Sequence, residues 1–581
     1  MERVQDHLKP AVLKKNFFSN IKQKKHMDQQ INTMIISCKH IAFIADSANI
    51  FSSKSRIQSK NTMNLIILIF LLCTQVLHVS THDILILQPF GSRSHRFALV
   101  PIAKQLGQHG HQVTFVSTYS FEDSIPANVT EIAYTQFADY FKILQGITID
   151  LGQDGWSIDI MKRYYNYHSD LCQQFFESRL LQNWISSGKL FKIVIIDSAM
   201  HECILPLWSF VGQNIVIMNT GLLNPWVSDY MNVPTPFAYI PFIGSPHNQH
   251  MDFFQRFVNT VYWILAKYVT RLSEDVFYKN VVLPYFPNSK PHRETLNNIS
   301  LALVNIDPIM TPPSPSVPNV IRIGGIQCRP PLPLPEGKLK NFVDSSDENG
   351  FILFSFGSVI DGSLINEKLR NTFIAAFAQI KQRVVWKYES QLSGLSNNVM
   401  TADWLPQQDL LGHPKIRAVI SHGGLQSLQE SIYHAVPSIC FPFTTDQPSV
   451  VEITSAYGIV IKMNPYSVTV EEIVKAIDKA CKDEEMRKAV QRYSKIFHDR
   501  EEDPLNKAIF WIEYVMRHDG AMHLQTAAVG LNFFQYNLLD VSALAAVIVF
   551  LTFTLCYLGI KRLIQTLINQ VHNISFKLKM A

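Results

Sequence analysis

Residues 404–447 read WLPQQDLLGHPKIRAVISHGGLQSLQESIYHAVPSICFPFTTDQ. Within this stretch, residues 418–421 are a short apolar run, residues 422–424 are His-Gly-Gly, and residues 425–434 repeat apolar side chains with a helical period. A Val-Pro pair then precedes a second apolar run at residues 438–443. This order predicts a strand, a glycine turn, a helix and a second strand. The chain is therefore expected to contain parallel βαβ units and to belong to the α/β class.

The glycine turn of this unit suits a phosphate group. Gly423 and Gly424 let the backbone approach a ligand closely, and the start of the following helix offers free N–H groups and the positive end of the helix dipole. Ser427 lies in the first helical turn, and Glu430 follows three residues later on the same face. We therefore expect His422, Ser427 and the backbone N–H groups to hold a diphosphate.

The remaining polar residues of the stretch suit the rest of a nucleotide sugar. Trp404 can stack on a base, and Gln407 can read the edge of that base. The carboxylate of Glu430 can accept hydrogen bonds from ribose hydroxyls. Asp446 and Gln447 follow the second strand, at the end of a parallel sheet where ligands bind, and are expected to hold the hydroxyls of the sugar.

The stretch resembles the signature of the UDP-glycosyltransferases, the family that includes UDP-glucuronosyltransferases and the plant and insect glucosyltransferases. The positions that match in register are Trp404, Pro406, Gln407, His413, His422, Gly423, Gly424, Ser427, Glu430, Pro437, Pro442, Asp446 and Gln447. The alternative is an ordinary βαβ unit whose Trp and His are core residues. Gln426, which we also place in the donor site, stands where many relatives carry Asn, so its longer side chain is expected to alter the contact with the diphosphate or the sugar.

The composition describes a globular protein with additional apolar segments. The chain has 581 residues, of which 47% are hydrophobic and 17% are charged, and its formal net charge is +5. This length leaves room for two or more domains, and the small net charge argues against a nucleic-acid partner. None of the eight cysteines forms a C-x-x-C pair, so a zinc site is not expected. A disulfide is compatible with a lumenal protein, but the sequence does not assign one.

The first 81 residues are interpreted as lying outside the folded enzyme. Residues 1–62 are polar, basic in places and without a domain pattern. Residues 63–81 have the apolar centre of a secretory signal peptide, with a cut near Ser80. The simplest account is that translation starts at Met63 or that the upstream segment is an over-extension of the reading frame. A signal-anchor with a cytoplasmic leader is the alternative.

A second βαβ pattern begins after this segment. Residues 83–88 form a buried-type strand, a loop follows, and an amphipathic helix reaches residue 109 before the next strand at residues 112–117. His95 follows the first strand at its carboxyl end, where open α/β sheets place ligands. In the resembled family, a G-x-x-S-H loop and a helix that ends in G-H carry the catalytic histidine, which by position is His95. The alternative is a solvated loop histidine.

A carboxylate ends another buried strand, at residues 192–197. The family keeps an Asp at this position that pairs with the histidine, so the resemblance implies that Asp197 orients His95. The alternative is an Asp that caps a helix starting near His201.

The resemblance implies the GT-B architecture, in which two Rossmann-like domains face a cleft. A strand at residues 319–327 and the proline-rich connector after it mark the boundary. We therefore predict an acceptor-binding domain at residues 82–325 and a UDP-sugar-binding domain at residues 326–535. In the second domain, a small-residue turn with Ser358 is expected to point at phosphate, and helices up to residue 517 complete the fold.

The acceptor pocket is expected in the least regular part of the first domain. Residues 234–241 are rich in proline and aromatic side chains, and residues 253–269 are rich in aromatic side chains. The second of these segments is interpreted as a core helix, with contact to a membrane as the alternative.

The carboxyl-terminal part predicts a single-pass membrane protein. Residues 541–560 are an apolar run long enough to span a bilayer, and the Lys-Arg pair after it places the tail, residues 561–581, in the cytosol. Two lysines near the end resemble the dilysine signal that retains type I membrane proteins in the endoplasmic reticulum, with the catalytic domains in the lumen. Asn128 and Asn298, each in an N-x-S/T motif, are then candidate glycosylation sites.

The residues and the resemblance together predict a UDP-dependent hexosyltransferase. His95 takes a proton from the acceptor hydroxyl as this hydroxyl attacks the anomeric carbon, and Asp197 stabilises the imidazolium. One displacement then inverts the anomeric centre. Because the chain offers no D-x-D carboxylate pair for a divalent ion, we expect no metal and no cofactor besides the UDP-sugar.

The sequence defines the identity of the donor sugar and of the acceptor less closely than it defines the reaction. The expected donor is UDP-glucose, and the expected acceptor is a small lipophilic alcohol, phenol or acid, as in detoxification. A lipid acceptor such as ceramide is an alternative. From another class of protein, the competing hypothesis is a catalytically silent membrane protein that binds lipophiles or a nucleotide sugar. Association with further copies of the chain is left open.

Overall fold

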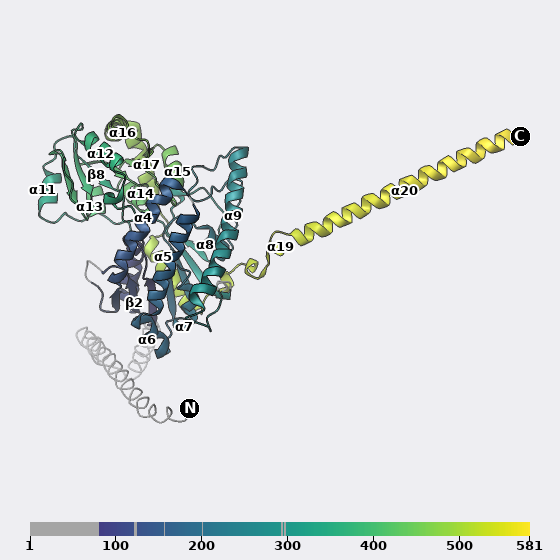
Figure 1. The fold of residues 1–581 in the computed structure, drawn as a ribbon, viewed down its shortest axis with the longest axis horizontal. Coiled ribbons are helices and arrows are strands. Elements are labelled where there is room, and N and C mark those ends of the chain that lie inside the picture. The colour runs from purple at the N-terminus through teal and green to yellow at the C-terminus, as the bar shows by residue number, and fades with distance from the viewer. Residues whose placement is uncertain are drawn as a thin grey trace, which may run out of the picture. The chain divides into compact units, whose positions relative to one another are not determined.

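The computed structural model describes residues 81–120, 125–155, 157–199, 201–291, 294–295 and 298–580 (Figure 1). The predicted amino-terminal extension and all of the predicted signal peptide except Thr81 lie outside these residues. Both sheets described below belong to one structural unit, which begins at Thr81.

The first half of this unit is built on a seven-stranded sheet in the order β3-β2-β1-β4-β5-β6-β7. The strands are β1 (Asp83–Gln88), β2 (Gln112–Ser117), β3 (Val129–Ala133), β4 (Ile193–Asp197), β5 (Ile215–Asn219), β6 (Ile299–Val304) and β7 (Val320–Arg322). All neighbouring strands are parallel. The order reverses between β1 and β4, and this switch point is where open α/β sheets bind ligands at the carboxyl ends of their strands.

Helices pack on both faces of the first sheet. They are α3 (Arg93–Gln108), α4 (Ala138–Asp154), α5 (Ile158–Phe176), α6 (Arg179–Ser187), α7 (Trp208–Val211), α8 (Pro225–Tyr230) and α9 (Phe253–Phe277), which continues as a π-helix over Tyr278–Val282. Along β1, Ile84 and Ile86 join the core that contains α3, whereas Leu85 and Leu87 join the core that contains α5. Successive side chains of a strand point to opposite faces, so this apolar run is buried throughout.

The second half is built on a six-stranded parallel sheet in the order β10-β9-β8-β11-β12-β13. The strands are β8 (Phe351–Ser355), β9 (Arg383–Lys387), β10 (Val399–Ala402), β11 (Ile416–Ser421), β12 (Ser438–Cys440) and β13 (Val460–Lys462). Its helices are α11 (Lys338–Asp344), α12 (Glu367–Phe377), α13 (Gln407–Leu411), α14 (Leu425–Tyr433), α15 (Gln447–Ala456), α16 (Val470–Lys482) and α17 (Glu484–His498). The prediction of two Rossmann-type parallel sheets is confirmed.

One helix lies elsewhere than the sequence suggested. Helix α18 (Pro504–Arg517) was expected to complete the second domain, but its apolar stripe packs into the core of the first sheet. Ile509 and Ile512 are buried there with Ile84, and Glu513 accepts a hydrogen bond from His109 Nδ1 at 2.7 Å. The helical period of the sequence predicts which residues of α18 form its apolar stripe. It does not predict which of the two sheets this stripe packs against.

Two further elements differ from expectation. The strand expected at residues 319–327 is reduced to the three residues of β7, because Gly324 and Gly325 turn the chain and Gly325 has φ +77°. Residues 253–269 do belong to a helix, but its aromatic side chains are largely exposed, so their interpretation as a core helix was wrong.

The carboxyl-terminal helix α20 spans Leu539–Met580. Within it, Leu539–Phe576 is long and apolar enough to cross a membrane, and its most apolar stretch of 18 residues has a mean hydropathy of 2.4 and is not buried against the rest of the protein. The helix continues through the predicted cytosolic tail. A membrane anchor at this end of the chain is consistent with these properties.

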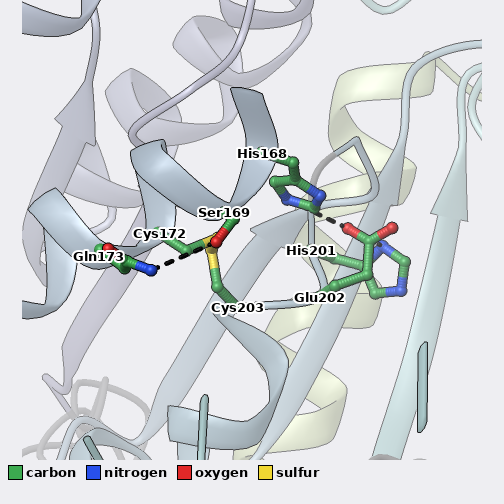
Figure 2. Close-up of a disulfide and its surroundings, with 7 residues drawn as sticks. All are labelled: His168, Ser169, Cys172, Gln173, His201, Glu202 and Cys203. Atoms are coloured by element: carbon green, nitrogen blue, oxygen red, sulfur yellow. Dashed lines mark hydrogen bonds and ion pairs between the residues drawn. A yellow bond between two sulfur atoms is a disulfide. The ribbon is translucent and has the colours of Figure 1, made fainter. Parts of the chain in front are cut away.

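Cys172 and Cys203 form a disulfide that joins α5 to the segment after β4 (Figure 2). Both residues are fully buried. The bridge lies beside His168, whose Nε2 is 3.5 Å from Glu202 Oε2. His168 and the two sulfur atoms lie within 4.8 Å of one another, as in a metal site, but the sulfur atoms are bonded to each other and so are not thiolate ligands.

Replacing both bridge cysteines with alanine is expected to lower the free energy of unfolding by roughly 3 kcal/mol, because the bridge restricts the unfolded chain over a sequence separation of 31 residues. Thermal unfolding of the full chain in lipid nanodiscs, with and without a thiol reductant, measures this effect. The reductant should destabilise the wild type and leave the double variant unchanged. Equal melting of the wild type with and without reductant would contradict the prediction.

Candidate active site

His95 and Asp197 meet at the switch point of the first sheet. His95 Nδ1 lies 2.8 Å from Asp197 Oδ2. His95 stands in the first turn of α3, where its backbone N–H donates to the N-cap Ser92, so it is not a solvated loop residue. Asp197 ends β4 and is 2% exposed. Its Oδ1 accepts from the backbone N–H of Ala199 at 3.1 Å, a local turn rather than the cap of a helix near His201.

The surroundings of His95 favour a strong base with a defined tautomer. Burial lowers its pKa, but the charge and hydrogen bond of Asp197 and the charge of Asp446 outweigh this effect, so the pKa lies above the ordinary 6.5. The side chain is 27% exposed. Since Nδ1 faces the carboxylate, Nδ1 carries the proton in the neutral ring, and Nε2 is the nitrogen that accepts one.

Thr220 was missed by sequence reasoning. Its Oγ1 lies 2.8 Å from His95 Nδ1, and its backbone carbonyl accepts from Gln426 Nε2 at 3.4 Å. Thr220 directly follows β5, the neighbour of β4, so the rule that ligands bind at strand ends could have found it. It joins the histidine to a residue of the predicted donor site.

The predicted donor residues Gln407, Ser427 and Glu430 lie together at the start of α13 and along α14. Gln407 Nε2 donates to Glu430 Oε2 at 2.6 Å and approaches Ser427 Oγ at 3.4 Å. Burial raises the pKa of Glu430 to about 7, although the hydrogen bond from Gln407 opposes the rise. The charged form of this carboxyl group is therefore poorly stabilised by the fold and would gain from further hydrogen-bond donors, such as a pair of hydroxyls.

His422 is buried in the glycine turn. A side chain at Gly424 would place its Cβ 2.4 Å from His422 Nε2, and one at Gly357 would place it 2.7 Å from the ring. Burial and the nearby charge of Lys387 lower the pKa of His422 to about 4. At neutral pH the ring is therefore uncharged, so that it would meet a phosphate as a hydrogen-bond donor and not as a cation; its contact with a phosphate remains a prediction. Gly423, with φ +79°, completes the turn.

Replacing Gly424 with alanine is expected to weaken UDP binding about tenfold, because the added methyl group collides with His422 and closes the approach to the N-terminus of α14. Calorimetric titration of the full chain with UDP checks this prediction. The matched control is Gly146→Ala, a helical glycine in α4 where an added Cβ meets nothing within 4 Å. Unchanged affinity in the Gly424 variant would show that UDP does not use this turn.

Ser358 and Trp404 touch the first half of the protein. Ser358 Oγ donates to Ser94 Oγ at 3.3 Å, and Ser358 O accepts from Gln145 Nε2 at 2.9 Å. The guanidinium of Arg93 lies over the Trp404 ring, 4.5 Å from its centroid. A base stacked on that face of Trp404 would have to displace Arg93, and base stacking remains a prediction.

Asp446 and Gln447 lie at the start of α15. Asp446 is the N-cap of this helix, yet its side chain makes no cap hydrogen bond, and its charge acts on His95. Burial raises its pKa above the ordinary value of 3.8. Gln447 is 3% exposed, and its Oε1 accepts from the backbone N–H groups of Phe443 and Thr444 at 2.8 and 3.3 Å. Gln447 therefore shapes the loop that presents Asp446, and its contact with a sugar remains a prediction.

An apolar pocket lies in the region predicted to hold the acceptor. Trp263 of α9 and Ser449 and Ile453 of α15 belong to its wall. The other lining residues come from α8 and the loops of the first half and are Leu222, Leu223, Ser228, Val233, Pro234, Thr235, Ile240, Pro241, Ile243, Thr311, Pro312, Ser314 and Pro315. Ser449 Oγ accepts from the backbone N–H of Gly244 at 3.0 Å, which joins this lobe to the helix that carries Asp446.

The predicted glycosylation sites are partly exposed. Asn128 Nδ2 donates to the carbonyl of Gly107 at 3.3 Å, and Asn298 Nδ2 donates to the carbonyl of Glu294 at 2.8 Å. Glycosylation requires each amide to leave this bond, and both sites remain predictions.

The matches to known proteins cover most of the chain. A family model described as UDP-glucoronosyl and UDP-glucosyl transferase matches residues 84–570. A UDP-glucosyltransferase 2 from Dactylopius coccus is 32% identical over 485 residues, which cover 82% of this chain and 90% of the relative. A 2-hydroxyacylsphingosine 1-beta-galactosyltransferase from Rattus norvegicus is 30% identical over 480 residues, covering 79% and 84%.

A solved structure, TcCGT1 in complex with UDP, superposes with a TM-score of 0.51 at 14% identity, covering 76% of this chain and 100% of the other. At this identity the likeness concerns the fold alone.

Proposed function

Because the chain belongs to the UDP-glucuronosyl and UDP-glucosyl transferase family and has its GT-B fold, we propose that it transfers glucose from UDP-glucose to a hydroxyl of a small lipophilic acceptor. The observation that carries the proposal is the His95–Asp197 pair, 2.8 Å apart, with the carboxylate of Asp446 close enough to act on its charge. A base and a group that can accept sugar hydroxyls thus belong to one site.

The acceptor is activated by proton transfer. Nε2 of His95 takes the proton of the acceptor hydroxyl as its oxygen attacks the anomeric carbon, and Asp197 stabilises the imidazolium through Nδ1. The bond to the UDP oxygen breaks as the new glycosidic bond forms, so the α-linked donor becomes a β-glycoside in one displacement.

The leaving UDP is stabilised by dipoles. The N-terminus of α14, the neutral ring of His422 and the hydroxyls of Ser358 and Ser427 supply hydrogen bonds to the diphosphate, and Glu430 accepts from the ribose. In this proposal the reaction needs no divalent metal. Gln426 donates a hydrogen bond to the carbonyl of Thr220, and this contact supports a role for Gln426 between the donor and the base.

Glucose is proposed as the transferred sugar because a similar protein is a glucosyltransferase. The Dactylopius coccus glucosyltransferase supports it, whereas the rat relative transfers galactose to a sphingolipid, so galactose and a lipid acceptor are the competing substrates. The apolar wall of the pocket beside α15 supports a lipophilic acceptor of either kind.

The proposed setting is the membrane of the endoplasmic reticulum. Helix α20 supplies the anchor, and the disulfide between Cys172 and Cys203 fits an oxidising compartment such as the lumen. The predicted signal peptide, the glycans on Asn128 and Asn298 and the retention by the terminal lysines belong to this proposal and await their own tests.

The experiment is donor turnover by the Met63 form in microsomes. UDP-glucose, UDP-galactose and UDP-glucuronate are each offered with a panel of phenols, with ceramide or without an acceptor, and UDP release is measured with and without EDTA. The expected result is release that requires UDP-glucose and a phenol and that persists in EDTA. Saturable UDP binding without turnover of any donor would favour the silent binding protein.

A further inference from the structure

Helix α9 presents an apolar face that the proposed reaction does not use. Between Phe253 and Thr270, every exposed residue is apolar or aromatic. These residues are Phe253, Phe254, Phe257, Val258, Val261, Tyr262, Ile264, Leu265, Tyr268 and Val269, and Leu272 and Val276 extend the set. At 100° per residue they fall on one half of the helix surface. The polar residues of this segment are less exposed than the apolar ones, which is the reverse of a water-facing helix.

The opposite face of α9 makes buried hydrogen bonds that fix the rotation of the helix. Asn259 is fully buried, donates to the carbonyls of Phe237 and Ile240 at 2.7 and 2.8 Å, and accepts from the backbone N–H of Phe242 at 2.6 Å. Trp263 Nε1 donates to the carbonyl of Ile240 at 3.1 Å. Rotating the apolar face inward would break these buried bonds, so the exposed face needs a partner outside the fold.

The same face continues into the segment that precedes the membrane helix. Tyr268 packs on Phe533 of α19 (Phe533–Tyr536), with ring centroids 6.2 Å apart. Lys267 Nζ lies 5.8 Å from the ring centroid of Tyr536. Helix α20 starts at Leu539, only three residues after α19 ends. Leu531, Phe533, Phe534 and Leu538 of this segment are also exposed.

From this continuity we infer that the apolar face of α9 docks on the lipid bilayer, in the leaflet from which α20 emerges. An aromatic-rich apolar face beside a membrane anchor suits the boundary between headgroups and acyl chains, where such helices lie parallel to the surface. Of the charged residues that border the face, Lys267 and Arg271 both pair with Asp229, whereas Asp252 and Asp275 are exposed and stand near its two ends. This inference goes beyond the proposed transfer reaction.

Docking in this way has a consequence for substrates. Trp263, on the opposite side of α9, lines the apolar pocket. One helix then separates the bilayer from this pocket, and a molecule dissolved in the membrane has a short path to it.

The first test is photolabelling of the full chain in phosphatidylcholine nanodiscs with a diazirine reagent confined to the bilayer. Residue-level mass spectrometry should find Phe254, Phe257, Leu265 and Leu272 labelled to an extent similar to α20. Exposed apolar residues elsewhere, Leu332, Leu364 and Ile496, should be labelled at least about tenfold less. Labelling of Trp263 alone would mean that the reagent entered the pocket, and would overturn the inference.

The second test asks whether α9 holds the protein on the membrane by itself. A protease site inserted after Gly530 allows the anchor to be cut from the folded chain in liposomes. After cutting, the wild type should stay with the liposomes, whereas a variant with Phe254→Glu, Leu265→Glu and Leu272→Glu should be released. The matched control carries Leu332→Glu, Leu364→Glu and Ile496→Glu and should stay bound.

Equal melting temperatures of the two triple variants would show that release is not unfolding. If the cut wild type is released like the α9 variant, or if α9 cross-links to α9 of a second copy instead of being labelled from lipid, the face does not dock on the bilayer. Neither readout depends on turnover, so the proposed function can fail while this inference stands.

Discussion

His95→Ala is expected to lower kcat by about 10³-fold or more while changing the affinity for UDP only a few-fold. The acceptor hydroxyl is a poor nucleophile at neutral pH, and a positioned base contributes about 10²–10⁴-fold. The effect falls on the chemical step, because His95 contacts Asp197 and Thr220 in the first half of the protein, whereas the residues predicted to hold UDP belong to the second half. Initial rates of UDP release together with calorimetric UDP binding separate the two quantities.

Asp197→Asn is expected to lower kcat by a similar factor, although the new side chain has the same shape. An amide can donate to Nδ1 of His95, which leaves the proton on Nε2 and removes the base. The double variant, which carries both His95→Ala and Asp197→Asn, should have a kcat no more than about tenfold below that of either single variant, since the two residues act as one unit.

The pH profile tests the same pair. The base must be neutral to act, and Asp197 raises the pKa of His95 against the effect of burial. Wild-type activity should therefore fall as the pH drops through this raised pKa. Without the carboxylate the pKa is lower, so the residual activity of Asp197→Asn should persist to lower pH. His109→Ala, at the C-cap of the same helix, is the control. A His95→Ala enzyme that keeps more than about a tenth of wild-type kcat would require a different base.

The strands and most helices could be predicted because their signals are local. An apolar run such as that of β1 has to be buried on both faces, and the carboxyl end of such a strand in a parallel sheet is a ligand position. His95 and Asp197 were therefore found together, from two strand ends that are neighbours only in the folded sheet. Their pairing itself came from the family resemblance.

The remaining features depend on contacts between distant segments, which no local pattern records. Thr220 approaches His95 across 125 positions of sequence. Arg93 covers Trp404 from the other half of the protein. The aromatic residues of α9 were predicted to lie in the core because apolar side chains are usually buried. In this helix most of them are exposed, and the polar residue Asn259 is fully buried. The sequence pattern of α9 therefore identifies the apolar face of the helix correctly, but the interpretation that this face packs against the protein core was wrong.

Glu430→Gln is expected to stabilise the protein without ligand and to weaken UDP binding by roughly ten- to a hundredfold. Both effects follow from the buried carboxylate, whose pKa is raised by burial from 4.5 to about 7. The variant loses the charge that accepts from ribose hydroxyls, and hydrogen bonds to charged groups contribute about 1.5–3 kcal/mol.

The stability effect has a defined pH dependence. The unfolded chain releases this proton near pH 4.5 and the folded chain near pH 7, so the folded state binds more protons between these values. Its stability therefore falls as the pH rises through this window, by up to about 3 kcal/mol, and the full cost is present above pH 7. Glutamine has no proton to release and avoids this cost.

Thermal unfolding of both proteins at pH 5 and pH 8, with and without UDP, separates the two effects. Without UDP, the variant should melt above the wild type at pH 8 and near it at pH 5. Saturating UDP should reverse the order at pH 8, because the ribose hydroxyls supply the donors that the carboxylate lacks. Glu452→Gln, at a carboxylate paired with Lys462, is the control and should show no such crossover. If Glu430→Gln melts below the wild type at pH 8 without UDP, the carboxylate is already compensated within the fold and is not held ready for a ligand.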